Sequence, residues 1–393
     1  MAGYTDYLNL YYKNPRTDGA DTFNIETMMN DNWDKIDEFA SMVGLPDSGK
    51  GLVYVKCIDA YGHPFPRCVV QINGSVSVSS KSGIARFSLV PGEYQAIVFG
   101  PIDYGIPEET ITVKSYNGSV SNFTVTIDAE PVVGNQITIT KSCVCTFSDR
   151  VVSADAFGIG GGGSGGVARN FICLAATGGA GGKTQTRYNI DTKNTFFVTV
   201  GAGGDSVSCS SSVDTSTYEK SGKSGGYTEI KTFDSVIIRA DGGEGGKGGY
   251  SASETAYIAL IGSNGGSGSG AACVSTQFPF AGNSGENGSS GEDTRNVSGG
   301  SGQGTTTCSF GEQKDGESFA SAGGSISRYK SNVASGSAGT GAGTPANGTS
   351  EDVAAGSAQT AGSGGGAAIV NGSGTATSGS GAPGLVMFRW EVA

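Results

Sequence analysis

The sequence predicts a mainly β protein, and three observations predict it. Apolar runs with strand-like alternation recur roughly every ten residues between residues 52 and 128, and turn signals such as Asn73-Gly74 separate them. Further along, runs such as 194–200 lead directly into clusters of glycine, whereas a flexible Gly/Ser linker shows no order in its apolar residues. The stretch 384–392 alternates between apolar and polar positions. A strand of this kind has to pair with a distant part of the chain, which favours a folded unit.

Composition and charge exclude several function classes. The formal net charge of -11 disfavours nucleic acid, whose phosphates bind basic surfaces, and also anionic membrane surfaces. Apolar runs are too short to span a bilayer, and the first residues lack the basic and apolar regions of a secretion signal. We therefore expect synthesis in a cytoplasm, without membrane insertion.

The cysteines predict free thiols. Eight cysteines are scattered along the chain, and the single histidine, His63, does not complete a zinc site. We expect no metal and no cofactor. A disulfide between Cys57 and Cys68 is the alternative if the two lie on neighbouring strands, although cytoplasmic synthesis disfavours it.

Residues 1–45 are predicted to form an extended arm followed by a helix. The arm is rich in tyrosine before Pro15, and Gly44 and Pro46 mark the end of the helix. Apolar positions in the helix alternate at spacings of four and three residues, the pattern of a short heptad seam. Two interpretations stay open: an amphipathic helix packed on its own domain, or a parallel bundle such as a trimer. The seam residues are Ile25, Met29, Asn32, Ile36, Phe39 and Val43.

Residues 46–51 are a predicted linker, and residues 52–128 a small β-sandwich. The order of three short motifs in the sandwich resembles the prealbumin-like, or carboxypeptidase-regulatory-like, modules of many extracellular proteins. The resemblance implies a spacer without chemistry of its own. The motifs are Asp59-x-x-Gly62-x-Pro64, Ser82-Gly83-x-Ala85-x-Phe87 and Pro91-Gly92-x-Tyr94.

Residues 129–393 are dominated by glycine. Of the 68 glycines, 13 precede Gly158, which leaves 55 in the last 236 residues. Glycine loses more conformational freedom on folding than any other residue, so this composition indicates either disorder or a fold that requires bare backbone. The strands that lead into the glycine clusters favour a folded glycine-rich domain over residues 129–393.

The glycine-rich part resembles a known family. Its order of elements is a strand with a GxGGGG run (157–166), a strand ending in Val-Gly-Ala-Gly-Gly (196–204), a strand ending in a glycine run (236–249), and Gly-Ala-Pro-Gly before a strand (381–390). This order resembles the glycine-rich domain of bacteriophage tail-fibre proteins and adhesins. The N-terminal arm and its helix are similar to virion-attachment segments in phages of Gram-positive hosts, on the residues Asn9-Leu10-Tyr11-x-Lys13-x-Pro15 and Asn32-Trp33-Asp34-Lys35-Ile36-Asp37.

The resemblance implies β-strands together with packed polyglycine II helices. Helices of the polyproline II type have no internal hydrogen bonds, so their backbone groups need partners on neighbouring helices. Only glycine permits the close approach that these lateral bonds require.

Segments of other composition interrupt the glycine runs, and we expect them to emerge as loops at the ends of the packed helices. They are 210–220, 250–261, 271–281, 305–322, 326–334 and 346–355. A rigid scaffold that presents adaptable loops suits recognition. Their aromatic residues are candidate receptor contacts, although some are expected to cover the scaffold's own glycine faces. The candidates are Tyr218, Tyr250, Tyr257, Phe278, Phe280, Phe310, Phe319 and Tyr329, with Phe278, Phe280 and Tyr329 favoured.

The sequence gives little support for catalysis. His63 has no neighbouring Ser or Cys motif, and Glu286, Glu292 and Asp293 are more simply solvated loop carboxylates than a glycosidase pair. We therefore expect a non-enzymatic virion adhesin at a tail or fibre tip, which binds a glycan or protein of the host bacterial surface. The alternatives are a purely structural tail-fibre or baseplate component and a polysaccharide depolymerase.

The expected partners follow from that interpretation. Residues 1–45 would bind other tail proteins and assemble a homotrimer, and the glycine-rich domain would bind the host surface. We expect the protein to be made in the host bacterial cytoplasm and to reside in the virion.

Overall fold

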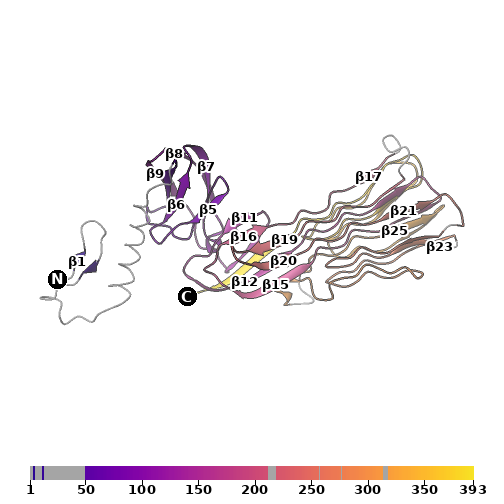
Figure 1. Ribbon diagram of the computed structural model, residues 1–393. Coiled ribbons are helices and arrows are strands. Elements are labelled where there is room, and N and C mark those ends of the chain that lie inside the picture. The colour runs from indigo at the N-terminus through magenta and orange to yellow at the C-terminus, as the bar shows by residue number, and fades with distance from the viewer. Residues whose placement is uncertain are drawn as a thin grey trace.

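The computed structural model describes residues 3–4, 11–12, 49–210, 218–255, 257–275, 277–312 and 317–393. This part of the chain is almost entirely β-strand and extended backbone, which confirms the predicted mainly β class. Figure 1 shows a small β unit beside a long bundle of parallel backbone runs, with short sheets at both ends of the bundle.

The N-terminal residues that are described form one short hairpin. Strands β1 (Gly3–Tyr4) and β2 (Tyr11–Tyr12) pair antiparallel. The predicted helix and its seam residues lie outside the described residues, so the helix and the trimer remain expectations.

The small β unit is a sandwich of two sheets. The first has the order β6-β3-β9 and the second β5-β4-β7-β8. Strands β3 and β9 pair in parallel, so the first and last strands of the sandwich are neighbours. Apolar side chains between the sheets form one core, which includes Val55, Val70 and Val98. The strands are β3 (Gly51–Ile58), β4 (Val69–Ile72), β5 (Ser75–Val78), β6 (Ile84–Leu89), β7 (Gly92–Phe99), β8 (Glu108–Ser115) and β9 (Val120–Thr126).

The turn at Asn73-Gly74 connects a hairpin whose second strand the sequence pattern did not reveal. Both residues have positive φ, 47° and 78°, as a two-residue hairpin turn requires. Strand β5 follows at once and pairs with β4, with Ile72 opposite Ser75. Serine alternates with valine in β5, so the strand carries too few large apolar residues to be recognised on its own.

The glycine-rich domain begins with a second sandwich, here called the base. Its sheets have the orders β10-β31-β12-β15 and β11-β16-β19-β20. Phe147, Phe196, Phe388 and Trp390 meet in the core between them, with ring centroids 5.7–5.9 Å apart. The strands are β10 (Gln136–Ile139), β31 (Leu385–Val392), β12 (Val151–Ile159), β15 (Thr184–Ile190), β11 (Cys143–Cys145), β16 (Phe196–Thr199), β19 (Thr228–Lys231) and β20 (Val236–Ala240).

Strand β31 pairs with strands that are far away in the sequence, as predicted. It lies between β10 and β12, with Ile137 and Ala156 both opposite Phe388. Val386, Phe388 and Trp390 are buried on the base core. Leu385, on the opposite face of the strand, is also buried, against Phe157 and Phe319.

The base is joined to the small sandwich by buried contacts. Ile102, in the 3-10 turn η2 (Ile102–Tyr104), belongs to the core of the base, and its backbone N–H donates to Thr146 O at 2.7 Å. The fully buried carboxylate of Asp103 accepts hydrogen bonds from Ser148 N (2.9 Å) and Oγ (2.6 Å) and from Arg150 Nε (2.7 Å). These contacts hold the two sandwiches together as one body.

From the base, glycine-rich segments run to the far end of the domain. We call these segments rods. The rod 160–166 shows their packing. Gly161 and Ser164 donate to the rod 221–227, Gly162 and Gly165 to the rod 378–384, and Gly163 and Gly166 to the rod 177–183, all at 2.9–3.1 Å. Each neighbour is therefore met every third residue, which is the repeat of the polyproline II conformation.

Three further rods surround the same segment. A Cβ atom on Gly161 would lie 2.0 Å from Ala202 O, one on Gly162 2.0 Å from Ser363 O, and one on Gly163 2.1 Å from Glu244 O. Contacts this close exclude any side chain, so the rod interior accepts glycine alone at these positions.

Four small sheets lie at the far end, here called the tip. They stack in the order first (β17-β30-β28), second (β18-β13-β29-β27), third (β21-β14-β25-β26) and fourth (β22-β23-β24) (Figure 1). The strands of the first two are β17 (Ser208–Cys209), β30 (Ala376–Thr377), β28 (Val353–Ala354), β18 (Glu219–Lys220), β13 (Val167–Arg169), β29 (Ala368–Val370) and β27 (Ala346–Gly348). Those of the other two are β21 (Gly248–Ser251), β14 (Cys173–Ala176), β25 (Ile326–Tyr329), β26 (Asn332–Ser335), β22 (Ile258–Leu260), β23 (Ala272–Ser275) and β24 (Phe278–Ala281).

All eight cysteines are free thiols, as predicted. Cys57 and Cys68 are both fully buried in the core of the small sandwich. Contact with Cys57 and burial raise the pKa of the Cys68 thiol.

Candidate functional site

Aromatic side chains gather at the tip and at the base, because the packed interior of the rods between them accepts no side chain at its glycine positions. The tip strands are joined by turns, and the chain reaches the tip repeatedly from segments far apart in the sequence (Figure 1). The tip therefore brings together loops that the sequence separates widely.

The interrupting segments predicted from the sequence mostly lie at the tip. Strands β18, β22, β23–β24, β25–β26 and β27–β28 belong to five of them. The sixth, 305–322, contains η3 (Ser309–Gly311) and packs at the other end, against β12 and β15.

Three of the predicted receptor contacts are buried, so their assignment has to be corrected. Phe310 and Phe319 are 2% and 6% exposed and cover Phe157 of strand β12. Tyr329 is 5% exposed and packs on Cys173 in the core below the third tip sheet. Burial of a large aromatic ring stabilises a fold more than burial of a small side chain does. Here the scaffold itself buries these rings.

Two of the other candidates form one aromatic cluster at the tip. Phe171, in the turn after β13, stacks on Tyr250 with ring centroids 4.4 Å apart and meets Tyr218 edge-on at 4.6 Å. Tyr250 is the most exposed of the three, at 38%. The guanidinium of Arg169, which is buried, lies 5.3 Å from the Tyr218 ring.

The remaining candidates, Tyr257, Phe278 and Phe280, lie on the fourth tip sheet. Tyr257 and Phe278 are 54% and 58% exposed, and Phe280 is half-buried. Arg295 lies over Phe280, with its Cζ atom 4.4 Å from the ring centroid. The Tyr257 hydroxyl donates to Arg295 O at 3.1 Å.

Another arginine at the tip serves the scaffold. Arg328 is almost fully buried, and its guanidinium donates to Lys330 O (2.6 Å), Asn347 Oδ1 (3.0 Å) and Gly348 O (2.9 Å). Burial lowers the pKa of this guanidinium. These bonds tie the third tip sheet to strand β27 of the second. Lys330 itself reaches Glu254 at 3.0 Å on the surface.

The carboxylates considered for glycosidase chemistry cap backbone groups of the rods. Glu286 accepts from Thr340 N (3.0 Å) and Oγ1 (2.8 Å), Glu292 from Asn283 N (3.2 Å), and Asp293 from Gly299 N (2.7 Å). The hydrogen bonds from Thr340 hold the pKa of Glu286 below its usual value. A carboxylate engaged in this way satisfies a backbone donor that the glycine packing leaves without a partner.

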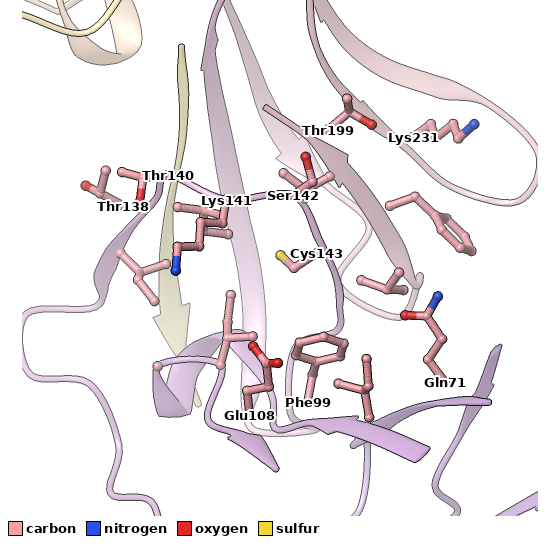
Figure 2. A pocket seen from close by; sticks show the side chains of 18 residues that line it. Gln71, Phe99, Glu108, Thr138, Thr140, Lys141, Ser142, Cys143, Thr199 and Lys231 are labelled. Atoms are coloured by element: carbon pink, nitrogen blue, oxygen red, sulfur yellow. The ribbon is translucent and has the colours of Figure 1, made fainter. Parts of the chain in front are cut away.

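A cleft of about 730 Å³ lies where the small sandwich meets the base (Figure 2). Ile97 and Phe99 line it from one side and Val144 and Phe197 from the other, and Figure 2 shows Cys143 facing into it. A hydrogen bond with Cys145 lowers the pKa of Cys143, and the same contact, together with burial, raises that of Cys145.

The described residues that line the cleft include Lys141 and Lys231 but no histidine beside Cys143. The chain's one histidine, His63, lies on an exposed turn of the small sandwich, with Nδ1 3.2 Å from Asp59 Oδ2. In the described ranges, groups of three or more His, Cys, Asp or Glu side chains able to hold a metal ion are also absent. Helices that are long and apolar enough to cross a membrane are likewise not found in that part of the chain.

Two tip residues in these clusters, half-buried Phe171 and exposed Arg295, were not among the sequence candidates. Phe171 stands in the interruption 167–176 and Arg295 in the interruption 292–298, both between glycine-rich segments. The interruption 167–176 is as long as the selected 346–355, so the same signal was present there, whereas 292–298 is shorter than any selected interruption.

Comparisons with known proteins identify the glycine-rich part. The model of a family described as "Glycine-rich domain" matches residues 138–391. A search of curated proteins gives no match.

Among solved structures, similarity is reported to DUF3823 family proteins of Bacteroides ovatus and Parabacteroides merdae. Both are 12% identical with a TM-score of 0.16, and cover 50% and 52% of this chain and 97% of their own. A leucine-rich repeat protein of Bacteroides thetaiotaomicron is 10% identical over 49% of this chain and 23% of its own, with a TM-score of 0.15. Scores this low say nothing about the fold.

Proposed function

Since this chain belongs to the glycine-rich domain family, we propose that it is a non-enzymatic virion adhesin that binds the host bacterial surface with the tip of its glycine-rich domain. The rods are polyglycine II helices in this proposal, and they act as a rigid spacer. The small sandwich and residues 1–45 connect the domain to other tail proteins, as a homotrimer.

One observation carries the proposal: a lattice whose packed interior excludes side chains ends in a surface with exposed aromatic rings. Loops from five of the predicted segments meet at the tip, and Tyr250, Tyr257 and Phe278 expose aromatic rings there. Exposed aromatic rings on a rigid support are efficient binding groups, because they bring large contact area at a low cost in conformational entropy. The lateral hydrogen bonds of the rods keep the loops in fixed relative positions.

The position of the C-terminus supports an experimental design. Strand β31 belongs to the base, and Ala393 N donates to Arg150 O at 3.0 Å. Figure 1 places this terminus at the end opposite the tip. A fluorescent protein fused after Ala393 therefore leaves the tip free.

The test is staining of a panel of bacterial strains with this fusion. We expect at least one strain to be stained, and the staining to be lost when Tyr250 and Phe278 are both replaced by alanine. The matched control is Phe233→Ala, because Phe233 is 71% exposed but lies in the β19–β20 turn of the base. Staining that survives the tip substitutions, or is lost with Phe233→Ala, would contradict binding through the tip.

A panel without any stained strain would favour the purely structural alternative. Release of soluble fragments from capsular or wall polysaccharide incubated with the protein would favour a depolymerase instead.

A further inference from the structure

The outer face of the fourth tip sheet carries an aromatic row. Ser275 of β23 is the register partner of Phe278 of β24, and Ile258 of β22 pairs with Val274, which places the preceding Tyr257 beside Ser275. Residues opposite each other on paired strands share a face, so Tyr257, Ser275 and Phe278 form one line across three strands. Neighbouring strands are about 4.8 Å apart, so the two rings stand roughly 10 Å from each other.

The other face of this sheet is buried in the scaffold. Ile258 and Val274 pack on Cys173 and Tyr329 of the third tip sheet. The fourth sheet is the last in the stack of tip sheets (Figure 1). Tyr257 and Phe278 lie on the face opposite to that of Ile258 and Val274. More than half of the surface of Tyr257 and of Phe278 is in contact with solvent.

A turn between two rods places a cation beside the row. Arg295 and Asn296 both have positive φ, 35° and 67°, and Val297 of the same turn packs on Cys273 of β23. This anchor holds Arg295 over the Phe280 ring, and the Tyr257 hydroxyl bonds to its backbone oxygen. We call Tyr257, Ser275, Phe278, Phe280 and Arg295 the aromatic shelf.

The guanidinium of Arg295 has no ion pair with any residue that the structure describes. The nearest carboxylate in the sequence, that of Asp293, is engaged by Gly299 N at 2.7 Å. A guanidinium stacked on a ring keeps its planar fork free for a carboxylate or phosphate, which it binds with paired hydrogen bonds.

We propose that the aromatic shelf binds an acidic glycan. Two neighbouring sugar rings lie on Tyr257 and Phe278, whose negative ring faces attract the polarised C–H groups of a sugar. A carboxylate or phosphate substituent of the glycan pairs with Arg295, and the Ser275 hydroxyl lies between the rings, where sugar hydroxyls need a partner. The inference rests on the proposed function and assigns it a ligand class.

A glycan fits this surface better than an apolar protein partner does. The row has only two strongly exposed rings, with a serine between them and a cation at its side. A protein interface of stable size would need a broader apolar centre. The positive charge of Arg295 favours an acidic glycan over its neutral backbone at this point of the surface, since a guanidinium binds a carboxylate or phosphate with paired hydrogen bonds.

The test is binding of the full chain to an array of oligosaccharides in matched sets: a carboxylated member, a phosphorylated member and the neutral backbone of each. We expect at least one acidic member to bind about tenfold more tightly than its neutral backbone, a difference that corresponds to one charge-assisted contact. Arg295→Gln should reduce the affinity for the acidic member to the affinity for the neutral one. Tyr257→Ala and Phe278→Ala should each weaken the binding of both members by about tenfold. Phe233→Ala should leave both affinities unchanged.

The outcomes distinguish failure of the aromatic shelf as a glycan site from failure of the proposed function. Equal binding of acidic and neutral members, or binding that the shelf variants leave unchanged, would overturn the shelf. An array without any bound member, together with stained cells, would also overturn it while the proposed function stands. Absence of both array binding and cell staining would overturn the proposed function itself. Unchanged thermal melting of the four variants shows that each remains folded, as expected for exposed side chains.

Discussion

Replacing Gly161 by alanine tests the packing of the rods directly. The new Cβ atom would lie 2.0 Å from Ala202 O, 2.7 Å from Ala202 C and 3.1 Å from Gly203 N. Ordinary contacts of this kind are longer than 3.4 Å, so the neighbouring rod has to move by more than an ångström. All the close atoms belong to backbone, and no side-chain rotation relieves the clash.

The magnitude follows from the bonds that share this contact. Gly161 N donates to Gly226 O at 2.9 Å, Gly243 N donates to Gly161 O at 2.9 Å, and Gly226 N donates to Ala202 O at 2.7 Å. Overpacking costs about 1–3 kcal/mol, and each weakened bond about 1 kcal/mol. We expect a loss of about 4 kcal/mol, which lowers the melting temperature by about 10 °C in a domain of this size. Valine, with a larger side chain, should cost more.

The assay is thermal unfolding by calorimetry, compared with Gly92→Ala. Gly92 lies at the start of β7, where an added Cβ would meet only the Tyr94 side chain at 3.4–3.5 Å. We expect the control to melt close to wild type. A Gly161→Ala protein that melts within about 2 °C of wild type would refute the close packing of the rods, since it would show that a side chain fits.

Three further predictions concern the joint, the rods and assembly. Asp103→Ala should lower the free energy of unfolding by about 3 kcal/mol, because it leaves the donors of Ser148 and Arg150 without their acceptor. Denaturant titration measures this change. An unchanged unfolding midpoint would contradict a rigid joint between the two sandwiches. The lowered pKa of Glu286 predicts that its stabilisation is present above pH 4.5, its usual pKa, and is lost as the pH falls through the lowered value. Wild type should therefore melt above Glu286→Gln at pH 7, with the difference closing towards pH 3; a difference that does not depend on pH would count against the bond from Thr340. Removal of residues 1–45 should abolish incorporation into particles and convert a trimer into a monomer of unchanged melting temperature, which light scattering and calorimetry measure; a truncated protein that remains trimeric would place the trimer contacts elsewhere.

Local patterns in the sequence determined much of the fold. The Asn73-Gly74 pair specified a hairpin turn, because both positions need positive φ. Strand β31 was recognisable from its alternation, and its pairing with a distant strand followed from the need to satisfy its backbone groups. The glycine clusters indicated close backbone packing, because their backbone groups also need hydrogen-bond partners.

The candidate site was only partly determined in this way. Tyr257 and Phe278 are exposed at the tip as expected, whereas Phe310, Phe319 and Tyr329 are buried. The sequence contains no signal for this difference, since all five stand in polar interruptions between glycine runs. Burial depends on which end of the bundle an interruption reaches and on which strand faces it there.

The sequence by itself thus determined that the chain would be β-rich, with glycine runs as scaffold and the interruptions as the place for recognition. Only the tertiary structure decided which rods are neighbours and which residues meet at the tip. The physical reason is that every rod offers the same repeating backbone donors and acceptors, so any two could pair equally well. Their arrangement is set by the two ends, where the base core around Phe388 and the small tip sheets fix the order of the strands. This order brings Arg295 beside Tyr257 and Phe280.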